Sequence, residues 1–174
     1  MGNNKFKLIN WSNTLSCGIR LIDEQHMELV NLVNEMFCHV TGNVEQEDIY
    51  FNKIIHEAVK YVKVHFSTEE KIMHATKFAG FTEHKRAHDN FILRVAEIAS
   101  DSSTGTRLSL YSFTKFLKDW ILSHIAVMDK QYFVYLKQIA THKMDGKLSI
   151  TAADVHSAVT ARNDSDANKL QNIA

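Results

Sequence analysis

The feature that most limits the fold of this chain is the absence of proline from all 174 residues, together with only six glycines. Proline and glycine are the residues that most strongly interrupt helices, so long helices can form here with few breaks. A chain of this length makes about one domain and can bury an ordinary core. We therefore predict an all-α fold.

Apolar residues recur with helical spacing in four stretches of the chain. The predicted helices cover residues 23–40, 45–74, 82–99 and 109–141. Asp23 and Thr82 are the residues expected to cap the first and third helices. Because short connections join successive helices, we expect an antiparallel up-down four-helix bundle.

The two ends of the chain differ from this periodic part. Residues 1 to about 22 form a mixed, aromatic-bearing stretch that we interpret as an N-terminal arm. Beyond residue 140 the chain is polar, with at most one short amphipathic segment. We expect residues 1–140 to form the bundle domain and residues 141–174 to form a polar tail, a short helix or a linker.

Composition excludes several classes of protein. Twenty Lys and Arg residues balance twenty Asp and Glu residues, and no long basic run is present, so the charge pattern of a nucleic-acid binder is missing. Two cysteines without CxxC spacing suit a reducing compartment. The N-terminus lacks a signal-peptide core, and no stretch is apolar enough to span a membrane. We expect a soluble, cytoplasmic protein.

One apolar stretch, WILSHIAVMD at residues 120–129, contains the ionisable residues His124 and Asp129. An ionisable side chain that is buried without a partner is strongly unfavourable, so both residues need a partner if they face the core. A step of five residues separates them by about 140° on an ideal helix. If the partners are metal ions, the histidine could bind one ion from one side while the carboxylate reaches between two ions. Alternatively the helix contains a local π-bulge, and the sequence leaves both alternatives open.

The other helices supply pairs of potential metal ligands. HxxxE in the second helix and HxxxH in the third place two donors on one helix face, because residues four apart are neighbours on a helix. The full set is His26, His65, Glu69, His84, His88, His124 and Asp129. Imidazole suits iron, zinc and copper, and carboxylates can bridge two ions. Five imidazoles and two carboxylates are too many ligands for one ion, so we predict a dinuclear metal centre.

This arrangement resembles the pattern of the hemerythrin family, in particular its bacterial members. A lone histidine, HxxxE, HxxxH and HxxxxD occur there in this order, and IDEQH, HFSTEE, HKRAH and HIAVMD carry them here. The resemblance includes Trp11, Trp120 and Tyr132 and covers about residues 8–138. No ligand position departs from the pattern, although Cys17 lies where family members often have valine.

The resemblance implies two iron ions joined by an oxo or hydroxo bridge, with dioxygen as the ligand. In the implied ligand set, one iron is held by His84, His88 and His124 and the other by His26 and His65, with Glu69 and Asp129 bridging both. The second iron would be one ligand short, and dioxygen would bind at that position.

We predict reversible binding of dioxygen by a carrier, store or scavenger rather than an enzyme. Ferritin-like di-iron proteins use ExxH pairs and further glutamates, whereas this chain has no ExxH motif. Imidazoles also donate less charge than carboxylates, so they stabilise high-valent iron less well. Four apolar residues lie within about a turn of the ligands and either line a dry dioxygen pocket or, as apolar residues at helical spacing usually do, simply pack in the core: Leu29, Trp120, Ile121 and Ile125.

Two other functions remain open. The same centre could sense oxygen or redox state and signal to a partner or a fused output domain through residues 141–174. A di-iron enzyme, such as a peroxidase, is the third class.

Residues outside the ligand pattern receive simpler interpretations. His39, His56, His74, His142 and His156 are expected at the surface. Glu70 and Glu83 are expected to be solvated. Cys17 and Cys38 are expected to be small buried residues.

Overall fold

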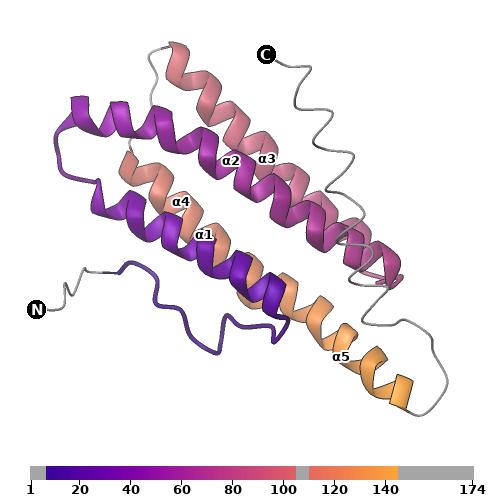
Figure 1. The fold of residues 1–174 in the computed structure, drawn as a ribbon. Helices are drawn as coiled ribbons and strands as arrows, with labels where there is room; N and C mark the ends of the chain where they lie inside the picture. The colour runs from indigo at the N-terminus through magenta and orange to yellow at the C-terminus, as the bar shows by residue number, and fades with distance from the viewer. Residues whose placement is uncertain (1–6, 105–109, 145–174) are drawn as a thin grey trace, which may run out of the picture.

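The computed structural model describes residues 7–104 and 110–144, which contain helices and loops and no strand. The elements are α1 (Arg20–Cys38), α2 (Val44–Ala75), α3 (Phe81–Thr104), α4 (Leu110–Ser123), the π-helix η1 (His124–Asp129) and α5 (Lys130–Met144). The predicted all-α bundle is therefore confirmed (Figure 1).

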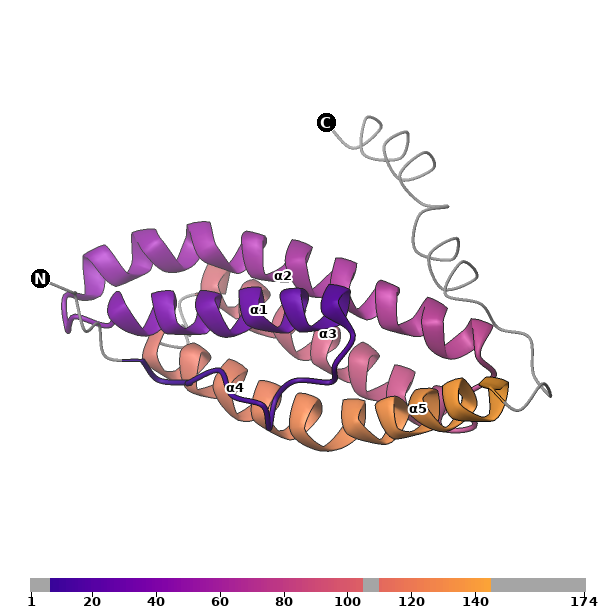
Figure 2. The ribbon, with the colours of Figure 1, turned by 60° about the horizontal axis from the view of Figure 1, so that its bottom comes forward.

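The last three helical elements follow one another without a break and form a single rod (Figure 2). Together with α1, α2 and α3 this rod completes a four-helix bundle. The five-residue step from His124 to Asp129 coincides with η1. A π-helix closes its turns between residues five apart, so it brings these two side chains back toward one face. Of the two alternatives left open above, the structure shows the π-helix.

Two predicted helix starts are wrong. α1 begins at Arg20, because the Ile19 carbonyl already accepts the first helical bond, at 2.9 Å from the Asp23 nitrogen. α3 begins at Phe81, one residue before the predicted cap Thr82. Asn43 is a true N-cap, since its side chain accepts a hydrogen bond from the Gln46 nitrogen at 3.1 Å.

Buried apolar residues form two clusters along the bundle. The larger cluster includes Leu29, Val62 and Ile125, and the smaller one includes Ile22, Ile72 and Tyr132. On α1, α2 and the last rod, the predicted metal ligands lie between a member of one cluster and a member of the other. The bundle thus places these polar residues inside its core, with apolar packing above and below.

The N-terminal arm packs along the bundle rather than extending into solvent (Figure 1). Asn34 of α1 pairs with both backbone groups of Ile9: its Oδ1 accepts from the nitrogen and its Nδ2 donates to the carbonyl, each at 2.9 Å. Leu15 and Cys17 are buried. Three residues of the arm, Ile9, Leu15 and Cys17, are therefore part of the core.

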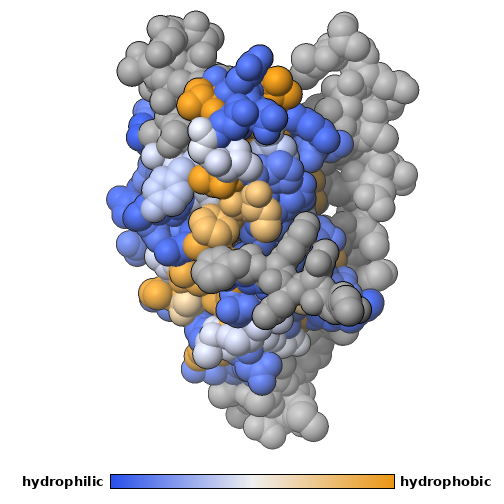
Figure 3. Space-filling view, turned by 90° about the vertical axis from the view of Figure 1, so that its left-hand side faces the viewer, coloured by the Kyte–Doolittle hydropathy of each residue, from blue (hydrophilic) through white to orange (hydrophobic). Residues whose placement is uncertain are grey.

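The end of the bundle where α1 turns into α2 is mostly hydrophilic, with hydrophobic residues in a narrow band across it (Figure 3). None of the helices within residues 7–104 and 110–144 is long and apolar enough to cross a membrane. Helix α5 continues to Met144, past the predicted domain boundary at residue 140. Residues 145–174, which include His156 and most of the predicted tail, lie outside the described residues.

Candidate metal centre

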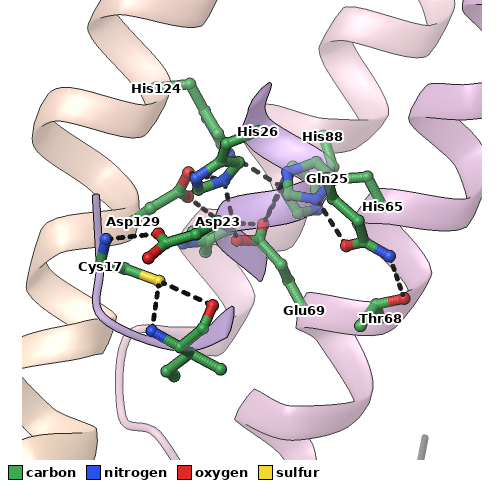
Figure 4. Close-up of polar contacts among 12 residues, drawn as sticks. Cys17, Asp23, Gln25, His26, His65, Thr68, Glu69, His88, His124 and Asp129 are labelled. Atoms are coloured by element: carbon green, nitrogen blue, oxygen red, sulfur yellow. Dashed lines mark hydrogen bonds and ion pairs between the residues drawn. The ribbon is translucent and has the colours of Figure 1, made fainter. Parts of the chain in front are cut away.

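The seven predicted ligands meet in the middle of the bundle. Each of them has at most 2% of its surface exposed. α1 contributes His26, α2 and α3 contribute one pair each, and η1 contributes the last two residues, so all four rods take part. Figure 4 labels each of these residues except His84.

One group of donors surrounds Glu69. The ligand atoms of Glu69, His84, His88 and His124 all lie within 4.8 Å of one another. Glu69 Oε2 lies 3.5 Å from His84 Nε2 and 3.4 Å from His88 Nε2. Oδ1 of Asp129 faces the same group, at 3.3 Å from His84 Nε2 and 3.2 Å from His124 Nε2. This group has enough donors for one ion.

A second group uses the same two carboxylates. The ligand atoms of His26, His65, Glu69 and Asp129 also lie within 4.8 Å of one another. His26 Nε2 is 3.3 Å from Asp129 Oδ2 and 3.8 Å from Glu69 Oε1. Each carboxylate therefore directs one oxygen to His26 and the other to the first group, which is the placement expected of bridging ligands.

The donor atoms that face the centre lack ordinary partners. Among the described residues, the unpaired buried atoms include both ring nitrogens of His26, Nε2 of His65 and His84, and both carboxylate oxygens of Glu69 and Asp129. His88 Nε2 and His124 Nε2 face each other at 3.0 Å. Leaving so many buried polar atoms unpaired is costly. Bound cations would satisfy the atoms that face the centre, which are Nε2 of His26, His65 and His84 and the four carboxylate oxygens, so the residues present fit a metal centre.

Burial keeps most of the imidazoles neutral. It lowers the pKa of His65 to about 3 and the pKa of His124 to about 4, and it holds the pKa of His88 far below its ordinary value. A neutral imidazole has a free lone pair, which is the form that binds a metal ion.

The carboxylates and His84 depart from this pattern because they are close together. Burial and the charge of Asp129 raise the pKa of Glu69 to about 7. Burial opposes ionisation of Asp129, but the nearby histidines, His124 first, hold its pKa well below the usual range. Burial alone would lower the pKa of His84, yet the two carboxylates, 3.5 Å and 3.3 Å from its Nε2, raise it to about 9.

A chain of hydrogen bonds fixes the orientation of His65. The Thr68 hydroxyl donates to the Val64 carbonyl at 2.9 Å, so its oxygen accepts from Gln25 Nε2 at 3.4 Å. The amide oxygen of Gln25 must then face His65 Nδ1, 3.1 Å away, and accept its proton. This leaves Nε2 of His65 unprotonated and directed at the centre (Figure 4).

Glu70 does the same for His88. Its Oε1 lies 3.1 Å from His88 Nδ1, and a carboxylate can only accept, so Nδ1 carries the proton. Lys85 Nζ lies 3.8 Å from the other oxygen of Glu70. The prediction that Glu70 is merely solvated is wrong, because its side chain is only 24% exposed and contacts a ligand on α3.

Aromatic rings stack on two of the imidazoles. Phe66 stacks on His88 with ring centroids 3.7 Å apart, and Trp120 stacks on His124 at 4.3 Å. Trp120 is half-buried, whereas the other predicted pocket residues, Leu29, Ile121 and Ile125, are buried in the larger cluster. The structure therefore places apolar groups beside the ligands, and their role as a dioxygen pocket stays a prediction.

The observed exposure of the remaining histidines, Glu83 and the two cysteines agrees with most, but not all, of the predictions. His39, His56 and His74 are exposed as predicted, while the side chains of His142 and His156 lie outside the described ones. Glu83 is exposed and Cys17 is buried, also as predicted. Cys38 is exposed, so its predicted burial is wrong: it ends α1 on the outer face of the helix.

Comparison with known proteins identifies the family of this chain. The family profile described as the hemerythrin HHE cation binding domain matches residues 17–136. The chain belongs to the hemerythrin family. All seven predicted ligands lie within the matched segment.

Individual hemerythrins support this membership. Bacteriohemerythrin of Stenotrophomonas maltophilia is 30% identical over 143 residues, covering 80% of this chain and 91% of the relative. Bacteriohemerythrin of Methylococcus capsulatus is 28% identical over 127 residues, covering 72% and 94%. A crystal structure of wild-type hemerythrin superposes with a TM-score of 0.65 at 27% identity and covers 74% of this chain and 98% of that one. A hemerythrin mutant gives a TM-score of 0.67.

Proposed function

We propose that this protein binds dioxygen reversibly at a non-haem di-iron centre and acts as an oxygen carrier, store or scavenger. The observation that carries the proposal is the convergence of seven buried donors in two overlapping groups, with the centre-facing atoms unpaired. Membership of the hemerythrin family supports the choice of iron and dioxygen.

In this proposal, the three-histidine half of the centre consists of His84, His88 and His124, the two-histidine half consists of His26 and His65, and Glu69 and Asp129 bridge the halves. A pair of ferrous ions would supply two electrons to dioxygen and recover them on release. The chain supplies neutral imidazoles, fixed by Gln25 and Glu70, and carboxylates already placed between both halves.

The apolar residues beside the centre would keep water out of it. Leu29, Ile121 and Ile125 are each at most 2% exposed, and Trp120 covers one face of His124. A dry surrounding slows proton-assisted side reactions, which would otherwise turn reversible binding into irreversible oxidation.

The test is a cycle of visible spectra on the full chain, loaded anaerobically with ferrous iron. We expect a charge-transfer band to appear with air, to disappear under argon, and to return on a second exposure. A band that bleaches once and does not return contradicts reversible binding.

A matched pair of variants checks the site. His124→Ala should lose bound iron and the band, because it removes a buried ligand of the three-histidine half. His56→Ala, at an exposed histidine of α2, should keep two iron ions and a normal spectrum. Iron content is measured by elemental analysis, and full iron in His124→Ala would contradict the ligand assignment.

A further inference from the structure

The two halves of the centre differ in their outer partners, which are the groups that accept the proton of the histidine nitrogen directed away from the centre. In the three-histidine half, the Nδ1 proton of His88 goes to a carboxylate, Glu70, at 3.1 Å. In the two-histidine half, the Nδ1 proton of His65 goes to a neutral carboxamide, Gln25, also at 3.1 Å. His26 has no partner for Nδ1 among the described residues. The two contacts have equal length, so they differ in the charge of the acceptor.

A charged acceptor affects the ligand more than a neutral one. A carboxylate that accepts the outer N–H of a metal-bound histidine raises the basicity of the inner nitrogen, and charge-assisted hydrogen bonds are stronger than neutral ones. Glu70 also brings a third negative charge close to the cations, beside those of Glu69 and Asp129. Lys85, which is held by Asp89 at 2.7 Å, lies on the far side of Glu70 and orients its second oxygen.

We propose that Glu70 makes the three-histidine half the tighter metal site, so that the first divalent cation binds there and the second binds more weakly beside His26 and His65. Glu70 acts here as a positioning residue, through His88. The inference rests on the two-metal centre of the proposed function. Its consequence is a stable one-metal state, in which the weaker half exchanges its ion while the tighter half keeps it.

Stepwise titration of the metal-free full chain with cobalt(II) tests this inference, with visible absorption and calorimetry as readouts. The unchanged chain should bind two ions in two resolved steps. Glu70→Gln should weaken the first step by about 10–100-fold, the usual effect of losing an outer partner of a metal ligand, and bring the two steps together. An unchanged first step in Glu70→Gln overturns the inference.

Glu97→Gln is the matched control. Glu97 is an exposed carboxylate of α3, the helix that carries His88, and it pairs with Arg94 at 3.0 Å. Its loss should leave the first step unchanged, because the effect requires contact with His88. A loss equal to that of Glu70→Gln would show a general effect of surface charge and overturn the role given to Glu70.

Two further variants locate the steps. His65→Ala should remove the weaker step and keep the tighter one, whereas His88→Ala should remove the tighter one; the reverse pattern overturns the proposal.

Gln25→Glu supplies a charged partner to the two-histidine half and should tighten the second step. This variant gives an independent check should Glu70→Gln unfold. A chain that binds fewer than two ions contradicts the proposed two-metal centre itself, whereas two steps insensitive to Glu70→Gln contradict only this inference.

Discussion

The hydroxyl group of Tyr132 is buried beside the candidate centre without a hydrogen-bond partner among the described residues. The residue is fully buried, and burial, reinforced by the charge of Glu69, raises the pKa of its phenol far above the ordinary value. An unpaired buried hydroxyl costs about 1–3 kcal/mol. The phenol ring packs in the smaller apolar cluster, so the ring stabilises the fold while the hydroxyl opposes it.

Tyr132→Phe should therefore stabilise the metal-free protein by about 1 kcal/mol, because it removes the unpaired group and keeps the ring. Urea denaturation of the chelator-treated chain measures the change. Tyr111→Phe is the control, since Tyr111 is 53% exposed and should show no change. A loss of stability in Tyr132→Phe would mean that the hydroxyl finds a partner in solution.

Single residues also show where sequence reasoning stops. The ligand pairs of α2 and α3 could be found because each has a four-residue spacing, which defines one face of a helix. Outer partners contact a ring on another helix: Glu70 is 18 residues from His88, and Gln25 is 40 residues from His65. No local period links such residues. Gln25 next to His26 and Glu70 next to Glu69 were the only hints, and adjacency does not show which helix a side chain faces.

At the scale of elements, the sequence predicted where helices run better than where they start. Asp23 was predicted to cap α1, but it lies in the first turn and its carboxylate serves the arm. It accepts from the Ser16 hydroxyl at 2.7 Å, the Cys17 nitrogen at 2.7 Å and the Gly18 nitrogen at 3.1 Å. Gly18 has φ +80°, a conformation that glycine adopts readily, which folds the arm back onto this carboxylate. The sequence marks Asp23 as an acidic residue near the helix start. Its partners precede the helix and form no periodic pattern, so the sequence does not predict these contacts.

Asp23→Ala should loosen the arm and lower the unfolding free energy by about 1–3 kcal/mol, because hydrogen bonds to a charged group are lost together. Thermal unfolding and hydrogen exchange of the Cys17 and Gly18 amides measure the effect. Glu24→Gln is the control: Glu24 forms an exposed pair with Arg20, and its loss should change little. Amides that remain protected in Asp23→Ala would contradict the role of this carboxylate.

At the scale of the whole molecule, the bundle surrounds its polar centre with two apolar clusters. The absence of proline and four periodic stretches were enough to predict the bundle, because neighbouring helices bury one face each. The site followed from that fold, since inward positions on four rods meet at one level. The helical starts and the arm did not follow, because they depend on contacts between specific residues.

Metal removal should lower the stability of the entire bundle. An ion that binds only the folded chain adds about 2.7 kcal/mol when its free concentration is 100 times its dissociation constant. For a chain of this size, that corresponds to a Tm shift of roughly 5–10 °C. Calorimetry with and without a chelator measures it, and equal Tm values would show that the centre is not occupied in the loaded sample.

Without metal, the protein should lose stability in acid. The pKa of His65 is lowered to about 3 and that of His124 to about 4, against 6.5 when unfolded, and His88 is lowered as well. Below pH 6.5 the unfolded chain binds more protons at these residues, so their contribution is complete above pH 6.5 and is lost as pH falls toward the folded values.

Two groups act in the opposite direction. The carboxyl group of Glu69, whose pKa is raised to about 7 from 4.5, stabilises the folded chain at low pH, and that contribution is lost as pH rises through 7. His84, whose pKa is raised to about 9, contributes its full stabilisation below pH 6.5 and loses it as pH rises through 9.

Between pH 6.5 and 4.5, the three imidazoles with lowered pKa outweigh the one carboxyl group with a raised pKa. The unfolding free energy should therefore fall by about 1 kcal/mol or more for each unit by which the pH falls in this range. Urea denaturation of chelator-treated protein between pH 6.5 and 4.5 measures this slope. His65→Gln should reduce the slope and the exposed His56→Gln should leave it unchanged, whereas a flat profile would mean that these imidazoles are already accessible to protons in the folded chain.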